Sequence, residues 1–104
     1  MPPAISGNGE HFEVHCSGVV AQQIYELQDS ATGKQKKEIA DAFWAVVKRL
    51  QVDPHDFGEP LYRLPSMRMQ VRTSVVPPLA VIFAVCEDRP HVFIKRVKLI
   101  GKRG

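Results

Sequence analysis

Residues 67–100 read MRMQVRTSVVPPLAVIFAVCEDRPHVFIKRVKLI, and this stretch decides the fold. Apolar and polar residues alternate from Met67 to Arg72, with the period of a strand that has one buried face. The segment from Leu79 to Cys86 is apolar throughout, which is typical of a central strand. A further strand is expected from His91 to Ile100, with a bulge near Lys95 where the alternation slips. Because their connections are short, these strands predict an antiparallel meander.

The sequence before these strands has helical periodicity. Apolar residues recur at helical spacing from Gly33 to Gln51, and Asp53-Pro54 ends that helix. A shorter helix is expected after Ser17, whose hydroxyl can cap it, and His11 to Cys16 alternates as an edge strand does. Leu61 to Leu64 is expected to form a short strand. The order strand, helix, helix and then three or four strands predicts an α+β domain with the helices on one face of the sheet.

Length and composition limit the classes of function. With 104 residues, of which 44% are hydrophobic and 24% charged, the chain is expected to form one domain at residues 10–100. Residues 1–9 are expected to be a flexible arm and residues 101–104 a basic tail. No apolar run is long enough to cross a membrane as a helix, and the N-terminus lacks the features of a signal peptide. A cytoplasmic protein without membrane contact is therefore expected, and its two cysteines are expected to be buried.

The charge is unevenly distributed along the chain. Residues 1–62 contain five basic and nine acidic residues, a net charge of −4, whereas residues 63–104 contain nine basic and two acidic residues, a net charge of +7. Lys and Arg gathered on one surface neutralise phosphates, so this asymmetry favours a nucleic acid or another polyanion as partner. Ordinary solvation of surface charges is the alternative explanation.

Strand parity predicts where part of this charge lies. The apolar residues between Met67 and Arg72 share one face, which we expect under the helices, so the polar residues should form a basic face on the opposite side. Solvation of an exposed face explains this pattern equally well. The residues predicted to bind nucleic acid are Arg68, Gln70, Arg72, His91, Lys95, Arg96, Lys98, Lys102 and Arg103.

No metal or cofactor site is expected from the sequence. The four histidines, His11, His15, His55 and His91, lack the spacing of metal ligands. His11 and His15 share a face of their strand, but they are roughly 13 Å apart along it. His91 is the one histidine in the basic part, which makes it a candidate for acid–base chemistry. No arrangement of nucleophile and base stands out, so an independent metabolic enzyme is not expected.

The order of the elements and several segments resemble the RelE/ParE superfamily of toxins from bacterial type II toxin–antitoxin modules. The segments are Leu50-Gln-Val-Asp-Pro54, Gly58-Glu-Pro-Leu61 and the three closing strands, and the resemblance covers roughly residues 11–100. It implies a small toxin that is neutralised by a cognate antitoxin. It also implies an action on RNA at the ribosome, as a messenger RNA interferase, or on DNA gyrase.

The resemblance implies catalytic roles for Arg68 and Arg72, which match basic positions that RelE-type ribonucleases place against the substrate. Other positions depart from the pattern of those enzymes. Gln70 stands where a second lysine is common, Ala80 stands where an arginine contacts the scissile phosphate, and no tyrosine follows the Gly101-Lys-Arg segment. Two hypotheses therefore remain open. The chain is a toxin with ribonuclease or gyrase-directed activity, or it is an inactive relative that binds an antitoxin-like helix or forms a homodimer.

Overall fold

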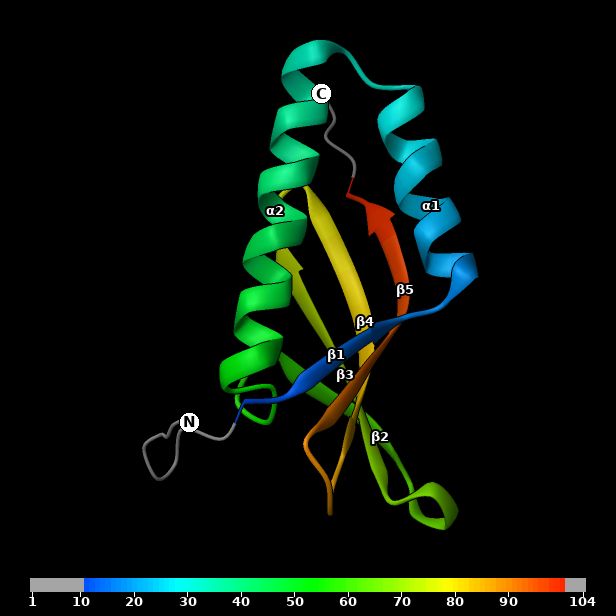
Figure 1. Ribbon diagram of the computed structural model, residues 1–104, viewed down its shortest axis with the longest axis vertical. Coiled ribbons are helices and arrows are strands. Elements are labelled where there is room, and N and C mark those ends of the chain that lie inside the picture. The colour runs from blue at the N-terminus through cyan, green and yellow to red at the C-terminus, as the bar shows by residue number, and fades with distance from the viewer. Residues whose placement is uncertain (1–10, 101–104) are drawn as a thin grey trace.

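The computed structural model describes residues 11–100, and its element order is the predicted one (Figure 1). The α+β class is confirmed. Within residues 11–100, no helix is long and apolar enough to cross a membrane. The predicted N-terminal arm at residues 1–9 and the predicted basic tail at residues 101–104 lie outside the described residues. The elements are β1 (Glu13–Cys16), α1 (Gly18–Asp29), α2 (Gly33–Val52), β2 (Glu59–Leu64), a 3-10 turn (Pro65–Met67), β3 (Met69–Val76), β4 (Leu79–Cys86) and β5 (His91–Leu99).

Both helices begin at residues that cap them. The Ser17 hydroxyl accepts a hydrogen bond of 3.2 Å from the Val20 amide, as the sequence predicts. Thr32 and Gln35 form a capping box, in which each side chain accepts a hydrogen bond from the amide of the other residue. Because the first amides of a helix have no partner within it, these caps set where each helix starts.

The sheet has the strand order β1-β5-β4-β3-β2. β2 to β5 form the predicted antiparallel meander, and β1 is the predicted edge strand. β1 runs parallel to β5, with Glu13 opposite His91 and His15 opposite Phe93. This pairing places the beginning of the described chain beside its last strand.

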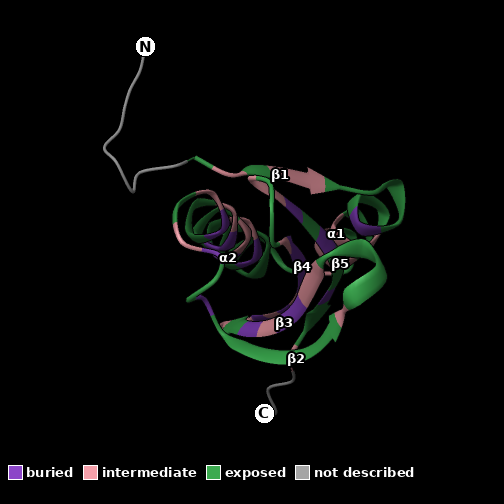
Figure 2. Ribbon diagram, turned by 90° about the horizontal axis from the view of Figure 1, so that it is seen from below, coloured by how far each residue is buried: buried purple, intermediate pink, exposed green. Residues whose placement is uncertain are grey.

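The core lies between the two helices and one face of the sheet (Figure 2). Ile39, Val46 and Leu50 of α2 are fully buried against this face, which includes Phe83 of β4. Burial of apolar side chains of this size is the main favourable contribution to folding. We call this side of the sheet the helix-facing side and the opposite side the open face.

The predicted alternation of β3 is present, but the prediction of which face the helices cover is wrong. Directly opposite residues of an antiparallel pair lie on the same face, and Arg72 is opposite Phe83 of the core whereas Val71 is opposite Ala84. Arg72 and Gln70 therefore lie on the helix-facing side, and Met69 and Val71 lie on the open face. The predicted basic face made of Arg68, Gln70 and Arg72 does not form.

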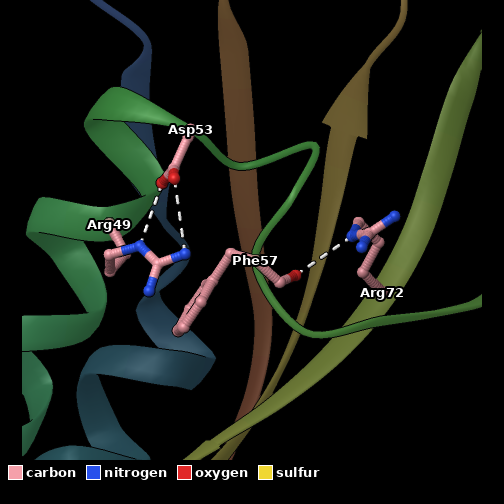
Figure 3. A network of polar contacts seen from close by, with 4 residues as sticks. All are labelled: Arg49, Asp53, Phe57 and Arg72. Atoms are coloured by element: carbon pink, nitrogen blue, oxygen red, sulfur yellow. Dashed lines mark hydrogen bonds and ion pairs between the residues drawn. The ribbon is translucent and has the colours of Figure 1, made fainter.

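Arg72 lies on the helix-facing side because it binds the loop that follows α2 (Figure 3). Arg72 is 7% exposed, and its guanidinium donates hydrogen bonds of 3.0 Å to the Phe57 carbonyl and 2.9 Å to the Gly58 carbonyl. Gly58 has a φ of +75°, and a Cβ there would lie 2.1 Å from the Thr73 carbonyl oxygen. Only glycine permits so close an approach of the loop to β3, and a buried cation that satisfies the loop carbonyls stabilises it.

The other side of the same loop is held by the end of α2 (Figure 3). Arg49 donates two hydrogen bonds to Asp53, and its guanidinium lies 4.7 Å from the centre of the Phe57 ring. The Phe57 ring in turn stacks on Phe83, with ring centres 5.7 Å apart. The loop after α2 thus packs over the helix-facing side of β3.

The predicted bulge near Lys95 is confirmed. Arg96 is opposite Ile82 and Ile94 is opposite Phe83, so Lys95 is the extra residue in β5. After this shift, Val97 packs into the core while Arg96 and Lys98 face away from the helices.

Candidate functional site: a cavity on the open face and a basic strand edge

One end of the open face contains an open cavity of about 550 Å³. β1, the turn between β2 and β3, and the ends of β4 and β5 contribute to its wall. The side chains that give the cavity its chemical character are His15, Arg68, Cys86, Arg89, His91 and Phe93. Cavities of this size with a few polar groups are typical of ligand sites.

Two histidines meet at the edge of this cavity. Nε2 of His15 lies 3.0 Å from Nδ1 of His91, and the same two nitrogens lie 3.6 Å and 3.3 Å from Oε1 of Glu13. The His15 ring stacks on the Phe93 ring at 4.7 Å, which restricts its orientation. The side chains of His15 and His91 are 38% and 33% exposed, so solvent reaches the cluster.

This cluster is not predictable from the local sequence pattern. Glu13 and His15 are two residues apart on β1 and share its open face, and His91 is opposite Glu13 because β1 pairs with β5 in parallel. The expectation that the histidines lack metal-ligand spacing was based on their separation along the chain, whereas the fold brings the donor atoms of Glu13, His15 and His91 within 4.8 Å of one another. The alternation of Glu13 and His15 was the only local signal, and it does not identify His91 as their neighbour.

Arg68 enters the same cavity from the turn after β2. It has a φ of +52°, a left-handed conformation that is uncommon for residues other than glycine and is enriched at functional sites. Its carbonyl accepts a hydrogen bond of 2.8 Å from the Glu87 amide, and its guanidinium lies 3.7 Å from Asp88. The main chain thus fixes the position of Arg68, and the exposed pair with Asp88 adds little stability.

A second ion pair joins β2 to the turn between β4 and β5. Arg63 donates two hydrogen bonds to the Glu87 carboxylate, with Nη2 of Arg63 2.7 Å from Oε1 of Glu87. The hydrogen bonds from Arg63 hold the pKa of Glu87 below its ordinary value, and desolvation opposes this shift. The pair therefore ties the end of β2 to the turn that contributes Asp88 and Arg89 to the cavity wall.

The two cysteines are poor nucleophiles. Partial burial raises the pKa of both the Cys86 thiol in the cavity wall and the Cys16 thiol at the end of β1, and the nearby Asp88 charge raises that of Cys86 further. A thiol with a raised pKa supplies little thiolate at neutral pH. The prediction that both cysteines are buried is wrong, because Cys16 is exposed and Cys86 is half-buried.

A separate group of exposed cations lies at the other end of the sheet, on β5. It consists of Lys95, Arg96 and Lys98. β1 pairs with β5 only as far as Ile94, and the Val97 amide beyond it donates a hydrogen bond to the Gln23 side chain of α1. The three cations therefore follow a sheet edge, with Arg96 and Lys98 on the open face.

The structure divides the predicted site residues into three sets. Arg68 and His91 line the cavity, whereas Lys98 is opposite Ala80 near the far end of β4, roughly 20 Å away along that strand. Gln70 and Arg72 lie on the helix-facing side, so the predicted catalytic pair Arg68 and Arg72 does not converge. Lys102 and Arg103 lie outside the described residues.

Aromatic side chains lie between the two groups of cations. Tyr62, Val71, Ala84, Phe93 and His15 occupy one row of cross-strand neighbours across the open face. Tyr62 and Phe93 are exposed. Val71 and Ala84, which lie between them in the row, are buried, so the exposed part of the open face has two separate aromatic rings and basic groups at both ends. No protein-family model matches the chain, and no curated protein is significantly similar to it in sequence.

Proposed function

We propose that the protein is a RelE/ParE-like toxin of a type II toxin–antitoxin module that acts in the cytoplasm on RNA at the ribosome. The order strand, two helices and antiparallel meander supports this proposal, together with the resemblance of the segments around Asp53-Pro54 and Gly58. The observation that carries it furthest is the open face, where cations flank exposed aromatic rings. Phosphates pair with such cations, and unpaired bases stack on such rings, which is how sheets bind single-stranded RNA.

The geometry supports binding more directly than catalysis. Arg72 is engaged by the loop carbonyls of Phe57 and Gly58, so its guanidinium does not reach the open face. Arg68 remains for contact with a phosphate, and Arg89 of the cavity wall joins it. RNA would run along β5, from His91 in the cavity past the exposed Phe93 ring to the cations at the far end of the strand.

RNA binding tests this proposal with a matched control for charge. A triple variant in which Lys95, Arg96 and Lys98 become Ala should weaken binding of a fluorescent single-stranded RNA by at least about 10-fold at low salt. The slope of log affinity against log salt concentration should fall by about 2, as expected for three lost phosphate contacts. Fluorescence anisotropy at several salt concentrations measures both quantities.

The control removes the same charge from the outer surface of α2. Lys34, Lys36 and Lys48 are exposed there, and their change to Ala should leave RNA affinity within about 2-fold of the parent. Equal weakening by both triple variants would mean that only net charge attracts RNA, and it would contradict the proposal.

Induced expression tests toxicity in a bacterial host without the cognate antitoxin. Growth should stop, and co-expression of a small acidic protein encoded by a neighbouring reading frame should restore it. Ribosome-dependent cleavage of messenger RNA would support action on RNA. Growth arrest with supercoiling defects and intact messenger RNA would instead indicate DNA gyrase as the target.

A catalytically inactive interaction module is the second candidate. Large exposed aromatic side chains on the helices favour it, since Trp44 of α2 is 63% exposed and Tyr25 of α1 is exposed as well. Exposed apolar side chains of this size are common where a partner helix or a second copy binds. Normal growth on expression, combined with a homodimer in solution that Trp44→Ala disrupts, would favour this candidate.

A further inference from the structure

We propose that Glu13, His15 and His91 form a binding site for a divalent transition metal ion, with Zn²⁺ as the ion that fits best. The three side chains come from two strands that are distant in sequence and adjacent in the sheet. Their three ligand atoms, one from each residue, all lie within 4.8 Å of one another. The site shares His15 and His91 with the cavity, but the metal proposal rests on the donor atoms alone and does not require RNA binding.

The spacing of the donor atoms matches tetrahedral coordination. Two ligands of a tetrahedral Zn²⁺ at about 2.0–2.2 Å from the ion are about 3.3–3.6 Å apart. The distances to Oε1 of Glu13 are 3.6 Å from Nε2 of His15 and 3.3 Å from Nδ1 of His91, and the two nitrogens are 3.0 Å apart. A small widening of the nitrogen pair would complete the triangle.

The types of donor select the class of ion. Two imidazoles and one carboxylate form the ligand set of many catalytic zinc sites, and imidazole suits Zn²⁺, Cu²⁺, Ni²⁺ and Co²⁺. Mg²⁺ and Ca²⁺ prefer sites made of oxygen ligands alone. The cluster therefore favours transition metals over the abundant alkaline-earth ions.

The fold holds the ligands in place before an ion arrives. The parallel ladder between β1 and β5 sets the separation of Glu13 from His91, and stacking on Phe93 orients the His15 ring. Ordering a free side chain costs conformational entropy, and stacking reduces that cost for His15, whereas the Glu13 side chain is 69% exposed and would be ordered by the ion. His15 and His91 also line the open cavity, so a bound ion would keep a coordination position for water or for an anionic oxygen.

The same distances also fit a cluster that binds no metal. In that cluster the two histidines share a hydrogen bond, and the Glu13 carboxylate accepts a hydrogen bond from one of them. Both readings agree with the distances, and titration with a metal separates them. The measurement uses tag-free protein, because an added histidine tag would bind the same ions.

Isothermal titration with Zn²⁺ should show one site per chain. An excess of Mg²⁺ should leave the affinity for Zn²⁺ unchanged. Co²⁺ should give the intense visible absorption of a tetrahedral complex, and Zn²⁺ should abolish that absorption. The variants His15→Ala, His91→Ala and Glu13→Gln should each weaken Zn²⁺ binding by about 100-fold or more, since even the partners of metal ligands contribute 10–100-fold.

His55→Ala is the matched control, because His55 is an exposed histidine that contacts Phe12 outside the cluster. It should leave the affinity for Zn²⁺ unchanged. Glu13→Gln keeps the shape of the side chain, so a far-ultraviolet circular dichroism spectrum like that of the parent should accompany its loss of affinity. Saturating Zn²⁺ should also raise the Tm of the parent by roughly 10 °C, and the three cluster variants should lose this rise.

Several results would overturn the proposal. One is Zn²⁺ binding that is equally strong in His15→Ala, His91→Ala and His55→Ala. Another is the absence of saturable Zn²⁺ binding to the folded parent protein. Octahedral Co²⁺ spectra that do not change between the parent and the cluster variants would also contradict it.

Discussion

Two arginines on either side of the start of β3 have opposite environments. Arg72 is buried on the helix-facing side, where its guanidinium is bonded to main-chain carbonyls of the loop after α2. Arg68 lies four residues earlier, in a left-handed turn, and its exposed guanidinium contacts only Asp88 at 3.7 Å among the described ion pairs. A basic residue in a sequence can therefore stabilise a fold or face a ligand, and its partners decide which.

The largest effect is expected for Arg72→Ala. This change leaves the carbonyls of Phe57 and Gly58 without donors under a packed loop, which should lower the free energy of unfolding by about 3 kcal/mol. Urea denaturation followed by circular dichroism measures it. Arg72→Lys should recover only part of the loss, since an ammonium cannot reproduce the forked geometry.

A stability loss below about 1 kcal/mol for Arg72→Ala would mean that the loop does not depend on this guanidinium. The comparison between the two arginines would then fail. RNA affinity gives a second test of the contrast. If folded Arg72→Ala lost as much RNA affinity as Arg68→Ala, Arg72 would belong to the binding surface, and the contrast would be wrong.

Arg68→Gly should have a smaller and opposite effect on stability. Glycine adopts a φ of +52° without steric cost, whereas a residue with a Cβ pays about 1 kcal/mol there. Since glycine also gives the unfolded chain more freedom, the net change should lie between zero and about 1 kcal/mol of stabilisation. Thermal denaturation measures it, and anisotropy should show weakened RNA binding in the same variant.

Arg68→Ala is the control, because it removes the same guanidinium and keeps the strained conformation. It should bind RNA as weakly as Arg68→Gly and be less stable than that variant. If Arg68→Gly is clearly destabilised relative to the parent, the Arg68 side chain has a structural role that its exposed position does not reveal.

The smallest effect concerns the ion pair between Arg63 and Glu87. The pKa of Glu87 is lower in the folded protein than in the unfolded chain, mainly because Arg63 donates hydrogen bonds to the carboxylate. Its stabilising contribution is therefore present above the unfolded pKa of about 4.3 and is lost as the pH falls through the lower folded pKa. Arg63→Ala should lower stability slightly at neutral pH and make the decline on acidification shallower.

Urea denaturation of the parent and of Arg63→Ala at pH 7, 4 and 3 gives both quantities. The two stability curves should converge at the lowest pH. Curves that stay parallel over this range would show that Glu87 carries no protonation-linked stability, and that the exposed pair does not tie β2 to the turn between β4 and β5.

Local chemistry was enough to predict most elements. Ser17 caps α1 as its position predicts, Leu79–Cys86 is the predicted central strand with the same bounds, and the bulge falls at Lys95. Helix periodicity, capping and proline chemistry act between residues that are near in sequence. Such features need no knowledge of the distant parts of the chain.

Local patterns were not enough to predict the candidate site. Alternation along β3 shows that Arg72 and Gln70 share a face, but it does not show which face the helices cover. That was decided by the loop at Phe57 and Gly58, which packs on β3 and needs a buried donor for its carbonyls. The alternation was predicted correctly and the covered face was not, so the predicted basic face does not form.

The sequence by itself determined the α+β class, the order of the elements and the charge of +7 in the second part of the chain. Only the tertiary structure decided that β1 pairs with β5 in parallel, and that Glu13 and His15 therefore meet His91. The physical reason is the distance along the chain over which each kind of interaction acts. Local propensities act over a few residues, whereas the partner of a strand depends on how the whole chain buries its apolar surface.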